Sequence, residues 1–353
     1  MKKYFFKGEK FKENHAGFKA RMDCEIILEN IGYKASLYKD IHLTKNSLIS
    51  KIQRFVLMIL KIVKIRNNSI IVINYPQFGE YLIYCINVMR KLKKCLVILL
   101  VHDIDSIRTS NCNKKFEQEK KIFAESDYII SHNEKMTKIL AEKYNVNYDK
   151  IVNLYLFDYL MNNQTNDIRR KFEEAVVVAG NLDINKAGYV YKLADIFETI
   201  SLNTYGPNCN LKKFSGNYKG SFLPEEIPNV LNGKYGLVWD GESLDSCKGD
   251  YGNYLRYNNP HKVSLYLVSG LPVIIWKQAA LAELIETENL GIVVENLYEL
   301  EERILSVSEK EYQVMLSNVE RYRKKLLQGK FLQSAIEEVE RRIKQNNYGK
   351  VGK

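Results

Sequence analysis

The sequence predicts two successive α/β domains, each built on a doubly wound parallel sheet. A length of 353 residues exceeds what one core usually fills. Strand patterns alternate with helical ones along most of the chain, and the strands are apolar throughout, as in sheets covered on both faces. The alternation lapses in the polar stretch 157–172. We expect an N-terminal domain over 1–160, a C-terminal domain over 161–308, and a helical stretch over 309–353 that packs back toward the first domain.

In the first half, five segments carry apolar residues at helical spacing, and four short segments between them are strongly apolar. Helices are expected at 20–33, 47–66, 79–94, 113–126 and 134–144, and strands at 34–39, 69–76, 95–103 and 127–133. Because strands separated by helices cannot form hairpins, this order predicts parallel pairing.

The second half repeats the pattern, with turn residues after each strand. Strands are expected at 174–182, 200–208, 235–241, 271–276 and 290–296, helices at 188–197, 220–233, 260–270 and 279–289, and a long helical tail at 309–345. Two such halves predict the GT-B arrangement, in which two Rossmann-like domains face a central cleft.

The composition is that of an ordinary globular protein, with 46% hydrophobic and 27% charged residues. Six scattered cysteines form no CxxC pair, which argues against a zinc site or a disulfide framework and for reduced thiols. The N-terminus lacks the apolar core of a signal peptide, and no apolar run approaches the roughly 20 residues of a spanning helix. We therefore expect a cytoplasmic protein.

The net charge of +11 is concentrated in the first half. Residues 1–170 contain 30 Lys and Arg against 18 Asp and Glu, whereas the remainder contains 23 against 24. Such asymmetry predicts an anionic partner for the first half: nucleic acid, a phosphorylated substrate or a lipid surface. No nucleic-acid recognition motif accompanies the charge, so we do not expect nucleic acid.

Residues 51–66 form a strongly apolar segment with basic flanks. Ten apolar residues stand among Lys51, Arg54, Lys61, Lys64 and Arg66. This composition is typical of a helix that lies on an anionic membrane, but a helix that covers a sheet with a wide buried face has it too and is the more common case. An intermediate case would pack the helix and leave its basic edge on anionic lipid at the inner face of the membrane.

Small, polar or aromatic residues follow four strands of the second half. Ligands of open α/β sheets bind beyond the carboxyl ends of the strands. The residues at these ends are Gly180-Asn181, Tyr205-Gly206-Pro207-Asn208, Asp240-Gly241 and Lys277-Gln278-Ala279-Ala280. Each set also suits an ordinary turn. The occurrence of all four sets in one half of the chain favours a nucleotide crevice. Since GxGxxG and GxxxxGK[ST] are absent, this crevice is neither the dinucleotide site nor the P-loop.

The segment NNPHKVSLYLVSGLPVI, residues 258–274, predicts a helix that opens at Pro260 with Asn258 or Asn259 as its cap. Acidic residues are favoured in a first turn, but here His261 and Lys262 occupy it. The helix start and Lys262 suit an anion such as phosphate, unless the lysine is merely solvated. The next helix is expected to begin at Ala279-Ala280, whose small side chains permit close approach to a diphosphate.

In the first half, Asp103 follows the most apolar strand. A carboxylate facing the cleft there could act as a general base, or it could cap the following turn. The loop before the first helix contains Asn14 and Gly17, which could close over a sugar.

Together these segments resemble the glucosyltransferase-3-like family. The resemblance is carried by VHDIDSIR, AGNL, YGPN, LVWDG, NNPHKVSLYLVSGLPVI and AALAELIETENLGIVV, and is strongest over 176–296. This family includes a bacterial enzyme that adds glucose to serine-rich adhesins and β-1,6-galactofuranosyltransferases of polysaccharide synthesis. The resemblance implies a GT-B fold, a UDP-sugar donor, no obligatory metal and a homo-oligomer.

The resemblance also implies that Lys186, Tyr205 and Lys262 contact the uridine diphosphate. The adhesin enzyme has Arg in place of Lys186, and the loop around it differs in length. The motifs NPHK and VWDG are nearer to the galactofuranosyl members, with glucose as the next candidate. Asp103-Ile104-Asp105 matches the DxD metal motif of single-domain glycosyltransferases, whose layout this sequence lacks.

We thus expect a UDP-sugar-dependent transferase that builds a cell-surface glycan, with an acceptor attached to a polyprenyl diphosphate as one candidate. Tyr205 would stack near uracil, Lys262 would neutralise diphosphate without a metal, and Asp103 would deprotonate the acceptor in an inverting displacement. The expected donor-binding residues are Gly180, Asn181, Lys186, Tyr205, Gly206, Asn259, His261, Lys262, Ala279 and Ala280. The alternative is a non-catalytic sugar- or nucleotide-binding partner of another transferase.

Overall fold

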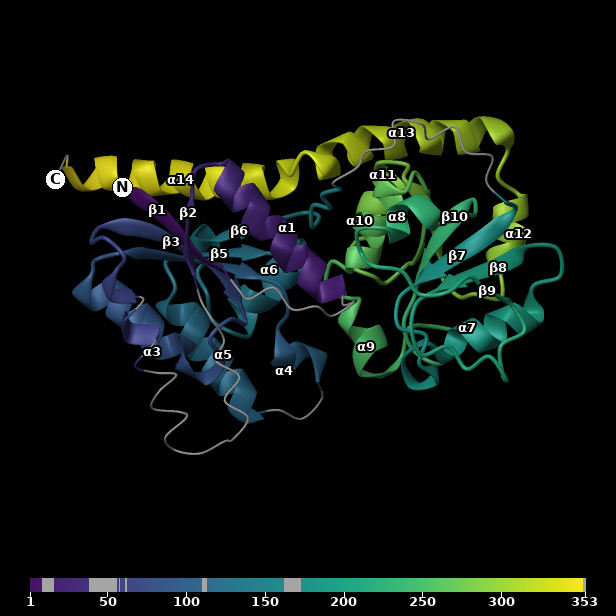
Figure 1. Ribbon diagram of the computed structural model, residues 1–353, viewed down its shortest axis with the longest axis horizontal. Helices are drawn as coiled ribbons and strands as arrows, with labels where there is room; N and C mark the ends of the chain where they lie inside the picture. Colours follow the sequence, from purple (N-terminus) through teal and green to yellow (C-terminus); the bar gives the residue numbers. More distant parts are fainter. Residues whose placement is uncertain are drawn as a thin grey trace. The chain divides into compact units, whose positions relative to one another are not determined.

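The computed structural model describes residues 1–7, 16–37, 56, 58–60, 62–109, 113–161 and 173–351. The chain forms two compact units, shown in Figure 1. Unit 1 comprises Met1–Glu13, Arg21–Leu154 and Leu332–Lys353, and unit 2 comprises Asn14–Ala20 and Tyr155–Phe331. No helix within the described residues is both long and apolar enough to span a bilayer.

Unit 1 contains a six-stranded parallel sheet in the order β2-β1-β3-β4-β5-β6. Its strands are β1 (Lys2–Lys7), β2 (Lys34–Leu37), β3 (Ser69–Tyr75), β4 (Leu96–Val101), β5 (Tyr128–Ser131) and β6 (Ile151–Asn153). The sequence pattern did not predict β1 or β6. Lysines occupy both ends of β1 and leave only a short apolar centre, while β6 has just three residues.

The helical segments of unit 1 follow its strands in the alternation expected of βαβ units. Those with defined bounds are α1 (Ala16–Asn30), which begins in unit 2, η1 (Gly79–Tyr81), α3 (Leu82–Asn87), the π-helix η2 (Val88–Leu92), α4 (Asp105–Arg108), α5 (Asn113–Glu125), α6 (Glu134–Glu142) and η3 (Tyr148–Lys150). Residues 56, 58–60, 62 and 63 are helical as well.

The last helix, α14 (Lys330–Val351), binds the strands of unit 1. The Glu340 carboxylate accepts hydrogen bonds from Lys3 Nζ at 2.7 Å and from Tyr33 Oη at 2.9 Å. Arg342 donates to the carbonyl of Ile151 at 2.9 Å. Helix α14 therefore packs with the sheet of unit 1, although it follows the strands of unit 2 in the sequence.

Unit 2 contains a second parallel six-stranded sheet, ordered β12-β11-β10-β7-β8-β9. Its strands are β7 (Ala175–Ala179), β8 (Ser201–Tyr205), β9 (Asn217–Tyr218), β10 (Tyr235–Val238), β11 (Val273–Trp276) and β12 (Gly291–Val294). Its helices are α7 (Ile184–Ile196), α8 (Ile227–Val230), α9 (Gly249–Tyr254), α10 (His261–Val268), α11 (Ala282–Thr287), α12 (Leu300–Leu305) and α13 (Glu309–Leu327).

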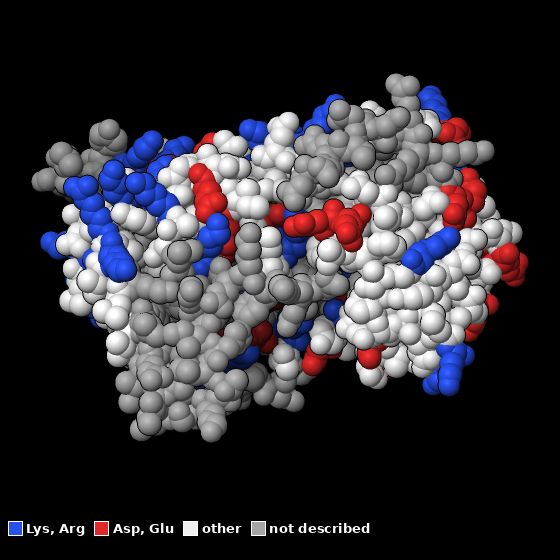
Figure 2. All heavy atoms as spheres, in the orientation of Figure 1, with Lys and Arg blue, Asp and Glu red and all other residues white. Residues whose placement is uncertain are grey.

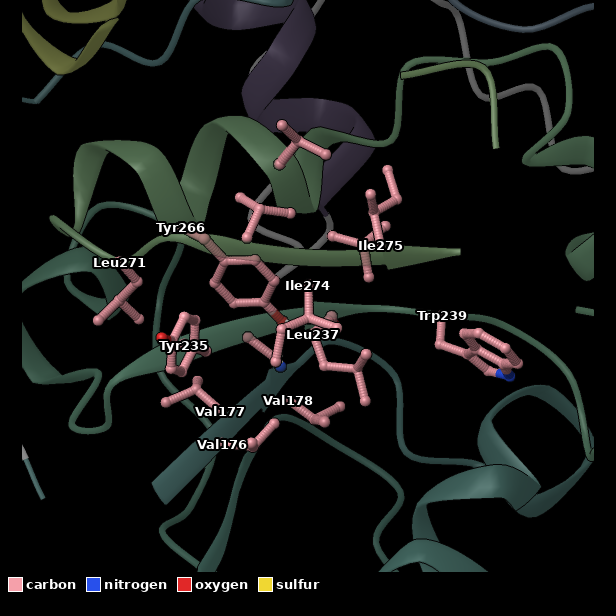
Figure 3. Close-up of a cluster of buried hydrophobic side chains, with 14 of the residues drawn as sticks. Val176, Val177, Val178, Tyr235, Leu237, Trp239, Tyr266, Leu271, Ile274 and Ile275 are labelled. Carbon is pink, nitrogen blue, oxygen red and sulfur yellow. Dashed lines mark hydrogen bonds between the residues drawn. The ribbon is translucent and has the colours of Figure 1, made fainter. Parts of the chain in front are cut away.

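Tyr266 fixes α10 to the sheet of unit 2 (Figure 3). Its ring fills the space beside Gly236, where any side chain would collide with it. Its hydroxyl accepts from Ala179 N at 2.8 Å and donates to Leu237 O at 3.2 Å. Gly236 of β10 pairs with Val177 of β7. If the parallel ladder continued from this pair, Ala179 N would donate directly to Leu237 O. The phenol therefore replaces a rung between β7 and β10 and separates the strands near their carboxyl ends.

Candidate functional site

The carboxyl ends of β7 and β8 meet through two glycines. Gly180 N donates to Tyr205 O at 2.9 Å, and a Cβ on Gly206 would overlap the Gly180 carbonyl. Gly206 also has a φ of +136°, a conformation that favours glycine. A Cβ on Gly180 would lie 3.2 Å from Lys262 Cε. These two expected site residues thus lie together, directly beside the lysine side chain.

Lys262 forms a largely buried ion pair at the end of β10. Its Nζ lies 3.0 Å from Asp240 Oδ1 and donates to the Trp239 carbonyl at 3.3 Å. The side chains of Lys262 and Asp240 are 18% and 13% exposed. The alternative reading, a merely solvated lysine, is therefore wrong. The sequence did not predict the pairing, in which Asp240 supplies an anion from within the chain itself.

The first turn of α10 differs in two respects from the expectation. The N-cap residue is Pro260, in extended conformation with φ −66° and ψ 130°, and in the described part of the chain no side chain caps the helix. Asn259 is buried and instead donates through Nδ2 to the Tyr155 carbonyl at 2.9 Å. The predicted asparagine cap is thus wrong. The N-terminus of α10 is still positively charged, because the helix dipole is joined by Lys262 and the first turn contains no acidic residue.

His261 lies in an apolar environment, with its ring stacked on Tyr159 at 4.9 Å between centroids. Burial, together with the positive charge of Lys19, lowers the pKa of His261 to about 4. The imidazole is consequently neutral near pH 7, and its Nε2 has no hydrogen-bond partner among the described residues. His261, one of the expected donor-binding residues, therefore brings no positive charge to an anion at neutral pH.

Tyr205 is also buried, with 2% of its surface exposed. Its hydroxyl accepts from Asn232 N at 3.1 Å, and its ring packs against Phe222 at a centroid distance of 6.2 Å. Burial raises the pKa of its phenol. A ring enclosed in this way presents no face to a base, so the structure contradicts the expected stacking of Tyr205 on uracil.

Asn181 and Lys186 lie on the loops around the same strand ends. Asn181 Oδ1 accepts from Asp183 N and from Asn208 Nδ2, both at 3.0 Å, and so ties the loops after β7 and β8 together. The Lys186 carbonyl accepts from Gly241 N at 2.9 Å, which holds the start of α7 next to the end of β10.

An aromatic side chain that the sequence pattern did not single out also lies here. Lys186 Nζ stands 5.0 Å from the centroid of the Tyr251 ring, on α9. Tyr251 is 43% exposed, in contrast to Tyr205. A tyrosine between two glycines, in GDYGNY, is the sequence signal that could have identified it.

The backbone of Ala279 and Ala280 is occupied within unit 2. Ala279 N donates to Trp276 O at 2.9 Å, and Ala280 N donates to Leu255 O at 2.8 Å. Helix α11 begins only at Ala282. These two N–H groups are therefore not available to a diphosphate, and the expected helix start at Ala279-Ala280 is wrong.

In unit 1, Asp103 follows β4 and forms an ion pair with Arg108 at 3.4 Å, with both side chains more than one-third exposed. The N-cap of α4 is Ile104, so Asp103 is not the cap residue. The carboxylate of Glu119 holds this turn instead, since it accepts from Asp105 N at 3.0 Å and Ser106 N at 3.2 Å.

Two other expectations concern residues at the margin of the described chain. Asn14 lies outside the described residues, and Gly17 lies in the first turn of α1. Among the described residues, no group of three or more His, Cys, Asp and Glu side chains is placed to hold a metal ion.

Comparison with known proteins accounts for this architecture. The N-terminal domain of the glucosyltransferase 3-like family matches residues 3–156, and its C-terminal domain matches residues 176–339. The β-1,6-galactofuranosyltransferase WbbI of Escherichia coli (strain K12) is 32% identical over 345 residues, which are 95% of this chain and 98% of WbbI. Glucosyltransferase 3 of Streptococcus gordonii is 26% identical over 249 residues, covering 70% and 71% of the two chains.

Solved structures show the same fold at low sequence identity. Anabaena Alr3699/HepE in complex with UDP has a TM-score of 0.63 at 10% identity, over 98% of this chain and 100% of that one. WaaG, a glycosyltransferase involved in lipopolysaccharide biosynthesis, has a TM-score of 0.58 at 12% identity, over 95% and 99%. The predicted GT-B fold is confirmed. The chain belongs to the glucosyltransferase 3-like family of glycosyltransferases.

Proposed function

We propose that this protein transfers a hexose from a UDP-sugar to a cell-surface polysaccharide or glycoconjugate. Galactofuranose is the favoured sugar and glucose the next, because the relative that matches almost the whole chain is named a galactofuranosyltransferase and other relatives are named glucosyltransferases. The observation that carries the proposal is the position of Lys262 in the first turn of α10, against Gly180 and Asp240.

The diphosphate would bind at the start of α10. Helix N-termini attract phosphate through unbonded N–H groups and the helix dipole, and Lys262 adds a full positive charge. Because Gly180 has no side chain, the Lys262 side chain packs against its backbone and reaches the strand ends where the phosphate oxygens would lie. When the diphosphate arrives, the ammonium of Lys262 turns from Asp240 toward it or is shared between the two.

The nucleoside would lie toward Lys186 and Tyr251. The exposed ring of Tyr251 can stack on a base, the role that sequence reasoning assigned to Tyr205. Asn181, at the adjoining loops, can bond to ribose or phosphate. The UDP-bound complex of a structural neighbour supports a uridine nucleotide as the ligand of this fold.

The chemical step would be a single displacement at the anomeric carbon. The bond from that carbon to the diphosphate oxygen breaks as the acceptor oxygen attacks, and UDP leaves with additional negative charge. Lys262 and the α10 amides stabilise that charge without a metal. Asp103 would take the proton of the acceptor hydroxyl. We further propose a polyprenyl-diphosphate-linked acceptor at the inner membrane face, and a homo-oligomeric enzyme.

Binding measurements on two lysines test the donor site. Lys262→Ala should weaken UDP binding by about tenfold or more, because a charge-assisted contact is lost, and should leave uridine binding unchanged. Lys277→Ala is the matched control, because Lys277 also follows a strand of unit 2 and pairs with a carboxylate, Glu295, but is exposed. Equal UDP affinity in both variants would refute the site. Melting curves without ligand confirm that both variants are folded.

Turnover measurements test the reaction. Purified protein is assayed for UDP release with UDP-galactofuranose and UDP-glucose, in the presence of lipid-linked acceptor. Transfer by the wild type and its loss in Asp103→Asn support catalysis with Asp103 as the base. Unchanged turnover in Asp103→Asn removes that role, while UDP binding without any transfer favours the non-catalytic partner.

A further inference from the structure

The described residues between 56 and 66 have apolar side chains on two opposite faces. Met58 and Ile62 are buried against unit 1, at 3% and 0% exposure. Val56, Leu60 and Val63 are 48%, 54% and 62% exposed. Each set follows helical spacing, and the two sets are offset by two positions, which corresponds to about 200° around a helix. The second apolar stripe therefore faces away from the core.

A neighbouring segment extends this exposed stripe. Lys93 Nζ donates to the Val63 carbonyl at 2.8 Å, and Asn68 N donates to the Lys93 carbonyl at 2.9 Å. These contacts place the end of η2 beside residues 63–68. Leu92, the last residue of η2, is 73% exposed, the highest value among the large hydrophobic residues of the described chain.

The surroundings of these side chains are strongly basic. From Val56 to Cys95 the sequence contains seven Lys and Arg residues and a single acid, Glu80. Arg90 is paired with Glu125 and Asp127. Figure 2 shows, on the face that it presents, blue basic side chains gathered over unit 1 and red acidic ones predominating over unit 2.

We propose that unit 1 docks on an anionic lipid surface through a basic apolar patch. The patch is defined by the side chains of Val56, Leu60, Val63, Lys64, Arg66, Lys91, Leu92, Lys93 and Lys94. Exposed aliphatic side chains surrounded by lysines match a bilayer interface, where the apolar groups enter the acyl boundary and the ammonium groups meet phosphate headgroups. The centres of protein interfaces are instead depleted in lysine, which favours lipid over a protein partner. The inference does not depend on the donor site of unit 2.

Vesicle co-sedimentation tests the patch with the full chain. Wild-type protein should bind vesicles of phosphatidylglycerol and phosphatidylcholine and bind pure phosphatidylcholine at least tenfold less well. The double variant Val63→Asp, Leu92→Asp should lose about tenfold or more of the binding to anionic vesicles, because two apolar contacts become like-charge repulsion. Both side chains are exposed, so the fold should tolerate the change.

Matched variants separate the patch from general effects. Leu305→Asp changes an equally exposed residue of unit 2, at 64%, and should bind as the wild type does. Lys91→Glu with Lys94→Glu should abolish the preference for anionic vesicles, whereas Lys138→Glu, 68% exposed on α6, should weaken it only slightly. Equal binding to both vesicle types, or equal losses in Leu305→Asp and the patch variant, overturns the proposal. A second result would also overturn it: the wild type binds no vesicles, and sedimentation velocity shows a wild-type dimer that the patch variant converts to a monomer. The patch would then bind a second copy of the chain.

Discussion

The carboxylates that follow β10 in unit 2 and β4 in unit 1 have different surroundings. Asp240 is 13% exposed and lies 3.0 Å from Lys262, whereas Asp103 is 37% exposed and lies 3.4 Å from Arg108. Water screens the second pair, so its net contribution to folding is small. The first pair leaves an uncompensated, largely buried charge if either partner is removed. The same sequence feature, an acid two residues after an apolar strand, thus produces a preorganised electrostatic site in one unit and a partly exposed ion pair in the other.

The largest expected effect comes from the glycine that closes the strand ends of unit 2. Gly206→Ala should destabilise the protein by on the order of 4 kcal/mol, because its Cβ would overlap the Gly180 carbonyl at a strained φ. Gly249→Ala is the control, since Gly249 also has a positive φ but no atom near its Cβ position, and should lose about 1 kcal/mol. Urea unfolding measures both. Equal losses would show that the contact between the strand ends is unimportant.

Acid should affect both units, since each contains a histidine whose surroundings disfavour its charged form. Burial lowers the pKa of His132 and of His261 to about 4, from 6.5 in an unfolded chain. Between these pH values the unfolded state binds a proton that the native state excludes, so stability falls as the pH decreases from 6.5 to 4. Each histidine should account for as much as roughly 3 kcal/mol of that loss.

Single variants assign the acid effect to the units. His132→Gln and His261→Gln should each reduce the slope of unfolding free energy against pH over this window, measured by urea denaturation at several pH values. A slope that neither substitution alters would show that other groups control the acid response.

The two ion pairs should differ in a direct comparison. Lys262→Ala should cost about 2 kcal/mol of folding free energy because Asp240 is left largely buried and unpaired. Arg108→Ala should cost less than about 1 kcal/mol. The double variant Lys262→Met, Asp240→Asn should recover part of the loss, because no charge then remains unpaired. If both single variants lose the same stability in denaturant unfolding, the distinction between the strand ends fails.

The smallest expected effect concerns the hydroxyl that joins β7 and β10. Tyr266→Phe retains the ring beside Gly236 but leaves Ala179 N and Leu237 O without their partner, which should cost about 1–2 kcal/mol. Tyr312→Phe is a useful control. The Tyr312 hydroxyl donates to the Lys234 carbonyl at 3.1 Å, just before the start of β10 and away from the carboxyl ends of the strands. A loss of UDP affinity in Tyr266→Phe alone would connect the buried hydroxyl to the donor site.

Local sequence patterns predicted much of this molecule. Apolar runs such as VVVA and VIIW gave the strands of unit 2, and Pro260 marked the beginning of α10. These features depend on neighbours in the chain, so a single sequence reveals them. The position of Lys262 beside the strand ends followed from the same reasoning, because the start of a helix after a parallel strand lies at the carboxyl edge of the sheet.

Side-chain partners from distant segments could not be predicted in this way. The carboxylate of Asp240 reaches Lys262 from 22 residues away, and Tyr159 covers His261 from the segment that enters unit 2. Tyr205 lies at a strand end, where the sequence allows either burial or exposure, and only its packing against Phe222 decides between them. Strand β1 escaped detection because lysines occupy its two ends.

The tyrosine that replaces a rung between β7 and β10 makes a single backbone amide an indicator of donor occupancy. Exchange of the Ala179 N hydrogen requires the Tyr266 hydroxyl to withdraw. Because the ring of Tyr266 is packed against Gly236, we expect this withdrawal to involve a movement of α10. A ligand held by the first turn of the same helix would oppose the movement. Protection of the Ala179 amide against hydrogen exchange should therefore increase when nucleotide binds, although this amide lies inside the sheet and the ligand binds at its edge.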